Sequence, residues 1–182
     1  MKLPDSNSGG SIGGSILGNY KFISIYSKTT SASQTRLGTD IEKTVTKSEY
    51  VTKNNTGTTI IGATTMTTAN VSYSIDTLVD VYSYTNGMLT DSMQLPFQVT
   101  SPPSNGSAPY KMIGSDSAYF SSGFLSMGGS TQPTVALGAK LKMDGNKLYM
   151  TINTSQHNSQ EVQGVTVITD SDVYSVITLQ KL

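Results

Sequence analysis

Residues 69–99 read ANVSYSIDTLVDVYSYTNGMLTDSMQLPFQV, two alternating runs on either side of Asn86-Gly87. Asn and Gly both tolerate the positive φ that a type I′ turn requires, so the stretch predicts a tight β-hairpin. From Val71 to Val81 the odd positions are mostly apolar and the even positions mostly polar, the period of a half-buried strand. A straight strand over residues 69–85 would be about 55 Å long at roughly 3.3 Å per residue. Globular strands usually have about 3–10 residues, so we expect this ribbon to coil around a barrel.

Shorter alternating segments flank the ribbon, and no long apolar helical stripe occurs. They predict an all-β fold, a single antiparallel up-and-down β-barrel of about 8–10 strands over residues 18–182, with a β-sandwich as the alternative. The finer predictions are a first strand over 19–27, a polar loop over 28–40, a strand over 40–53, an exposed loop at 102–106, and turns at 144–146 and 170–172.

Composition excludes several classes of function. The formal net charge is zero and 13% of residues are charged, so no basic field exists to hold nucleic acid or an anionic membrane surface. The chain has no Cys and one His, His157, which rules out disulfides and a His- or Cys-based zinc site. We therefore expect no metal and no cofactor. No apolar run is long enough for a membrane-spanning helix.

Residues 1–17 (MKLPDSNSGGSIGGSIL) form a Gly/Ser-rich tract that predicts a flexible tether before the folded domain. Such a tether is typical of a mature lipid-anchored envelope protein, and on that interpretation Met1 replaces the lipidated cysteine of a precursor. The alternative is a cloning remnant or a frayed terminus.

Several short motifs accompany this tether: Gly18-Asn19-Tyr20 opening the first strand, LPFQVTSPPS at 95–104, SDSAYF at 115–120 and NKLYMTIN at 146–153. Together they resemble the lipocalin-like proteins that bacteria carry as small envelope lipoproteins. Gly18-Asn19-Tyr20 stands where lipocalins have a G-x-W motif, with Tyr20 in place of the Trp. The resemblance implies an outer-membrane lipoprotein facing the periplasm or the cell surface. Its barrel would bind a small apolar or amphipathic ligand, or serve as a structural lipoprotein with no ligand.

No catalytic group emerges from the residues. Asp76 and Asp80 share one face of a strand, but their α-carbons lie about 13 Å apart at the usual rise, whereas paired glycosidase carboxylates are about 5–9.5 Å apart. His157 lies in the polar stretch TSQHNSQ at 154–160, which predicts a loop with a solvated His157 side chain at its tip. Asp91 falls on the apolar side of its arm, which indicates either a ligand contact or a β-bulge, and we favour the bulge. We therefore expect a protein that is not an enzyme.

The candidate ligand-binding residues are the inward side chains of the ribbon, Tyr73, Ile75, Val79, Met93 and Phe97, beneath a covering loop at 121–136. The same positions would be plain core in a small filled barrel. A rival hypothesis is a β-sandwich carbohydrate-binding or protein-interaction module that uses Tyr82 and Tyr84 on its surface.

Overall fold

The computed structural model describes residues 15–121, 136–162 and 164–182, and within them every regular element is a β-strand. This confirms the all-β prediction. The strands are β1 (Gly18–Leu37), β2 (Asp40–Val51), β3 (Lys53–Ile61), β4 (Thr65–Thr85), β5 (Met88–Ile113), β6 (Ser117–Phe120), β7 (Leu137–Asp144), β8 (Lys147–Val162) and β9 (Val165–Lys181).

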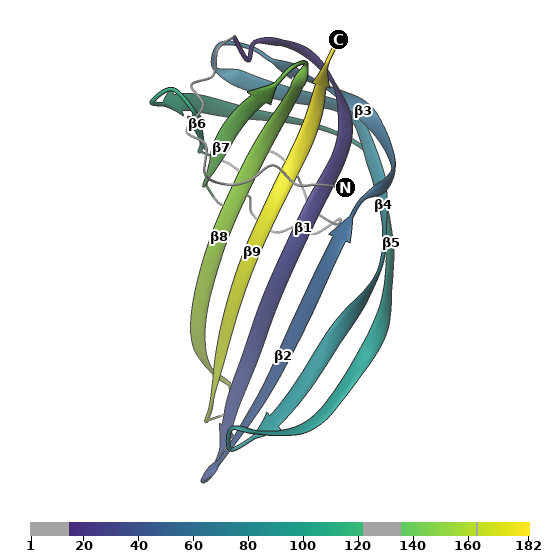
Figure 1. Cartoon of the computed structure of the whole chain (residues 1–182). Helices are drawn as coiled ribbons and strands as arrows, with labels where there is room; N and C mark the ends of the chain where they lie inside the picture. Colours follow the sequence, from purple (N-terminus) through teal and green to yellow (C-terminus); the bar gives the residue numbers. More distant parts are fainter. Residues whose placement is uncertain (1–14, 122–135, 163) are drawn as a thin grey trace.

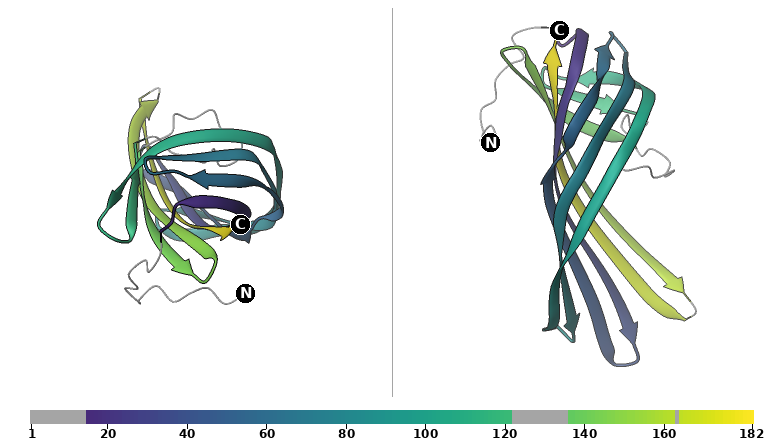
Figure 2. Two further views of the ribbon diagram at one scale, coloured as in Figure 1. Left: turned by 90° about the horizontal axis from the view of Figure 1, so that it is seen from above. Right: turned by 90° about the vertical axis from the view of Figure 1, so that its right-hand side faces the viewer.

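All of these strands belong to one antiparallel sheet that closes on itself (Figures 1 and 2). The ring runs β1–β3–β4–β5–β6–β7–β8–β9, and β9 pairs back onto β1. Strand β2 lies between β1 and β4, beyond the point where β3 separates them. The sheet therefore has one closed end, built around β3, β6 and β7.

The other end of the sheet is open. Strand β6 reaches only residues 110–113 of β5, and the pairing of β7 with β8 ends at Ile152. Beyond these limits, β4 is the only described partner of β5 and β9 the only described partner of β8. Figure 1 shows β8, β9, β1, β2, β4 and β5 continuing well past β6 and β7. We call the closed end the ring half and the extended strands the open half.

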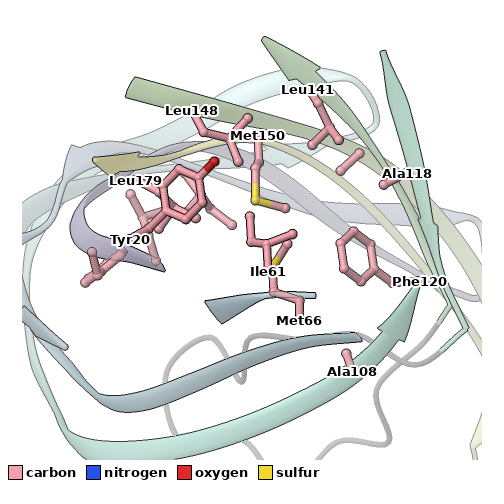
Figure 3. Close-up of a cluster of buried hydrophobic side chains, with 14 of the residues drawn as sticks. Tyr20, Ile61, Met66, Ala108, Ala118, Phe120, Leu141, Leu148, Met150 and Leu179 are labelled. Carbon is pink, nitrogen blue, oxygen red and sulfur yellow. The ribbon is translucent and has the colours of Figure 1, made fainter. Parts of the chain in front are cut away.

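The apolar core fills the ring half. The largest fully buried side chains include Tyr20, Phe22, Phe120, Met66 and Met150, which come from strands all around the ring. In Figure 3, Tyr20, Phe120, Met66, Met150 and neighbouring side chains point into one shared interior. We call the side of the sheet that faces this interior the inner face.

The described chain begins inside the predicted tether, at Ser15. Ile16 is only 7% exposed and belongs to the core. Its carbonyl oxygen accepts a hydrogen bond of 2.7 Å from the Tyr20 hydroxyl. Residues 1–14 of the predicted tether and residues 122–135 of the predicted covering loop lie outside the described residues.

Irregular pairings gather where the two halves meet. Register shifts occur at Phe22/Ser24 in β1, in the β3–β4 pairing, and between Thr68 and Tyr73 in β4. The backbone at Asn54, Gly57 and Asn70 takes positive φ here. Bulges of this kind bend strands sharply, which lets long strands close into a ring at one end and continue as an open sheet at the other.

The hairpin prediction at Asn86-Gly87 is confirmed. Thr85 pairs with Met88, and the two turn residues have φ of 52° and 83°. The predicted turn at 144–146 is confirmed as well, since Asp144 pairs with Lys147 and Gly145 has φ of 57°.

Four predicted loops are wrong. Residues 28–37 continue β1 and pair with both β2 and β9, residues 102–106 lie within β5, residues 154–160 lie within β8, and residues 170–172 lie within β9. At 102–106 the two prolines indicate a loop, but β4 is the only described partner of β5 there, and an edge strand tolerates proline. In the other three segments the polar side chains indicate loops, but both faces of the open half contact solvent, so polar residues fit a strand equally well. Backbone pairing on one or two sides decides the conformation instead.

Candidate functional site

A pocket of about 220 Å³ lies where the ring half meets the open half. It is lined by Ile25, Tyr50, Thr52, Tyr73, Ile75, Phe97 and Val99, which come from β1, β2, β4, β5 and the β2–β3 junction. None of these side chains is charged. The lining is mostly aliphatic and aromatic, with hydroxyl groups only on tyrosine and threonine.

The structure brings three of the five predicted ligand-binding residues together in this pocket. Tyr73 and Ile75 are 3% and 6% exposed and form its inner wall, whereas Phe97 is 41% exposed and stands at its mouth. Val79 and Met93 do not line the pocket. They lie further along β4 and β5 in the open half, on the same inner face, because Thr77 pairs with Phe97, Val79 with Leu95 and Val81 with Met93.

Some of the polar groups around the pocket form hydrogen bonds within the protein. Thr52 Oγ1 accepts a hydrogen bond of 2.9 Å from the Ile25 amide, and the Thr52 amide donates one of 2.9 Å to the Ile25 carbonyl. Burial raises the pKa of Tyr50, and a hydrogen bond with Ser27 partly offsets this. The Tyr50 hydroxyl therefore stays neutral at physiological pH, and the pocket is amphipathic but uncharged.

Beyond the pocket, the inner face of the open half continues as three cross-strand rows. In register, the rows are Thr154, Val173, Thr29, Ser48, Val79, Leu95; then Gln156, Ser171, Ser31, Thr46, Val81, Met93; then Asn158, Thr169, Ser33, Thr44, Ser83, Asp91. Directly opposed residues in a sheet point to the same face. Strands β1 and β2 thus present a block of six Ser and Thr side chains beside an apolar strip of four on β4 and β5.

Charge is distributed unequally between the two faces of the open half. The three inner rows contain one charged side chain, Asp91. The alternate, outward-facing positions of the same strands carry Lys28, Lys43, Lys47, Glu49, Asp80, Asp170 and Asp172. In the first two rows Gln156, Met93 and Leu95 are exposed. Burial in the protein core therefore does not explain why these two rows carry no charge. Nearer the strand ends the inner face carries Asp91 and Glu42.

The outward carboxylates have cross-strand partners. Asp76 lies 3.1 Å from Lys53 Nζ and accepts a hydrogen bond of 3.1 Å from Gln98, while Gln94 donates to Asp80 at 2.7 Å. The Gln98 hydrogen bond, followed by Lys53, lowers the pKa of Asp76.

His157 and Asp91 are the remaining candidate catalytic or ligand-contacting residues. His157 lies within β8 on the outer face, and its Nδ1 is 2.6 Å from Asp170 Oδ1, with both side chains more than half exposed. Asp91 is exposed on the inner face. A register shift lies next to it, between Ser83 and Tyr84, but Asp91 keeps the register of Met93 and Leu95, so the favoured hypothesis that a bulge turns it to the other face is wrong. Within the described residues no group of His, Asp and Glu could hold a metal ion.

The aromatic surface of the rival hypothesis is on the outer face. Tyr82 and Tyr84 are half-buried there, and Lys47 Nζ lies 5.4 Å from the centroid of the Tyr82 ring. A sugar stacking on Tyr82 would have to displace this ammonium group.

Sequence reasoning missed the hydroxyl block because residues 28–40 were predicted as loop. The signal was present in the chain as an alternation, with Ser or Thr at positions 29, 31, 33 and 35 and again at 44, 46 and 48. Period two in Ser and Thr indicates a strand face as clearly as period two in apolar residues.

No helix in the described part of the chain is long and apolar enough to cross a membrane. The sequence matches no family model and no curated protein, and the fold matches no solved structure.

Proposed function

We propose that this protein is a lipocalin-like β-barrel that binds a small, uncharged apolar or amphipathic ligand, and that it acts without catalysis. The observation that supports this most directly is the pocket at the mouth of the ring half, with its uncharged lining and its half-exposed Phe97. Pairing of β9 with β1 favours a barrel over two separate packed sheets.

The pocket is small for a ligand site. Pockets for drug-sized molecules are typically about 300–1,000 Å³, and this one is about 220 Å³. It suits one end of a molecule, such as a short alkyl chain or a single ring, while the remainder lies against the exposed inner face. Anchoring at a bacterial envelope through the N-terminal tract belongs to the same proposal and rests on the sequence of residues 1–17.

Binding of an uncharged apolar fluorophore, N-phenylnaphthylamine, tests the proposal, with octanol as the competitor. The chain contains no Trp, so fluorescence of the probe is free of interference from indole. We expect saturable binding that octanol displaces. Phe97→Ala should lower the affinity for the probe roughly tenfold. A ligand that covers about half of the Phe97 side chain gains about 1.4 kcal/mol from this contact, which corresponds to a factor of ten in affinity.

Leu78→Ala is the matched control. Leu78 is 53% exposed on the outer face of β4, so this variant removes a comparably exposed apolar side chain on the opposite face of the sheet from the pocket. Equal loss of affinity in both variants, or no saturable binding by the wild type, would show that the pocket is not a ligand site.

A further inference from the structure

The inner face of the open half is a surface whose chemistry the pocket alone does not explain. It starts at the pocket mouth, because Phe97 pairs with Thr77 and the next inward pair along is Val79 with Leu95. A molecule that emerges from the pocket at Phe97 meets this face first.

The face is divided lengthwise into two kinds of surface. On β4 and β5 the first two rows are Val79, Leu95, Val81 and Met93, with Leu95 and Met93 almost half exposed. On β1 and β2 the same rows are Thr29, Ser48, Ser31 and Thr46. Hydroxyl groups both donate and accept hydrogen bonds but carry no charge, so they match a partner that also has many hydroxyl groups.

Charged ligands are disfavoured by the same arrangement. The first two rows have no charged side chain across β8, β9, β1, β2, β4 and β5. An anionic or cationic head group held there would lose hydration without gaining an ion pair, which costs free energy. A neutral head group avoids this cost.

We propose that the ligand is a neutral amphiphile with a polyhydroxyl head group, of the chemical class of an alkyl glycoside or an uncharged glycolipid. Its apolar end enters the pocket behind Phe97, and its sugar lies across the rows of Thr29, Ser31, Ser48 and Thr46 while Leu95 and Met93 contact its apolar part. This inference rests on the proposed function, and it adds the chemistry of the head group.

The test compares three probes that share an eight-carbon chain and are kept below the concentration at which they form micelles. Octyl β-glucoside has a neutral sugar, octanol has a hydroxyl group alone, and octanoate is anionic. Isothermal titration calorimetry on the full chain should give octyl glucoside at least tenfold tighter than octanol, with octanoate weakest of the three.

Variants connect this preference to the face. Ser31→Ala combined with Thr46→Val should weaken octyl glucoside fivefold or more and leave octanol unchanged. Thr30→Val is the control, because Thr30 lies on the outer face of the same strand and is half-buried like Thr46. A loss in the double variant that Thr30→Val does not share supports the proposal.

The contrary outcomes separate the two proposals. Equal affinity for octanol and octyl glucoside would overturn the head-group inference and leave the pocket intact. Binding of none of the probes would overturn the pocket as well. A stable dimer by light scattering, with no glucoside binding, would overturn the inference in favour of a second copy of this chain as the occupant of the face.

Discussion

At the scale of single residues, Gly57 shows how the sequence permits the junction between the two halves. Its φ is +107°, and a Cβ added there would lie 2.6 Å from the Val71 α-carbon and 2.8 Å from the Asn70 carbonyl oxygen. Both atoms belong to the backbone of β4 and cannot rotate away. Close approach of β3 and β4 at their bulges therefore requires a residue without a side chain.

We expect Gly57→Ala to lower the free energy of unfolding by roughly 3 kcal/mol or more, from backbone strain and overpacking together. Gly87→Ala is the matched comparison, since Gly87 also has positive φ (+83°) but no atom within 4 Å of an added Cβ. It should cost only about 1–2 kcal/mol for the left-handed conformation. Urea unfolding of the two variants measures the difference, and equal costs would mean that β4 moves aside easily.

The turn at Asn86-Gly87 and the close approach at Gly57 show which features of the fold can be predicted from the sequence. Asn86-Gly87 was predictable, because the turn depends on two adjacent residues and their own φ preferences. The requirement at Gly57 was not, because it depends on strand β4 passing close by, and the register that brings Val71 there is visible only in the fold. Likewise Tyr73, Ile75 and Phe97 could be nominated from alternation alone, whereas Tyr50 and Thr52 join the pocket through pairing with β1.

At the scale of elements, β5 is an edge strand that combines exposed backbone with apolar side chains. Along residues 88–104 its only described partner is β4, and Met93, Leu95 and Phe97 are more than 40% exposed. Such an edge is a template for pairing with another chain. Pro96, opposite Leu78, has no N–H to donate, and proline in an edge strand turns its nitrogen toward solvent. We infer that Pro96 interrupts this edge and limits association.

Replacing Pro96 with Thr should restore a donor in the middle of the edge and favour self-association. We expect Pro96→Thr to form larger species than the wild type at the same concentration, measured by sedimentation velocity. Ser92→Thr is the control, because it places the same side chain on the same face of β5 without adding a backbone donor. Identical sedimentation of the two variants would place the protection of the edge elsewhere, such as in the twist of the sheet.

At the scale of the whole molecule, one sheet is closed at one end and open at the other. In the ring half the strands surround a packed apolar core. In the open half the same strands continue (Figure 1), and among the described residues they form no such core. All-β architecture and a coiled ribbon followed from the alternation and excess length of residues 69–99. Closure at one end alone could not be predicted, because it depends on how short β6 and β7 are relative to β5 and β8.

This division predicts that amide hydrogen exchange will differ within single strands. Residues 147–152 of β8 are paired on both sides and carry the buried side chains Leu148 and Met150, whereas β9 is the only described strand beside residues 153–162. Exchange by local opening requires little loss of buried apolar contact in the second segment, so it should exchange faster by an order of magnitude or more. Residues 26–35 of β1, paired with both β2 and β9 in the open half, should fall between the two and serve as the internal comparison. Mass spectrometry of peptides covering these segments measures the exchange of each segment directly.

Uniform slow exchange along β8 would mean that a ligand or another chain covers the open half in solution. Adding octyl glucoside under the conditions of the binding test would then identify whether a ligand or a second copy is responsible.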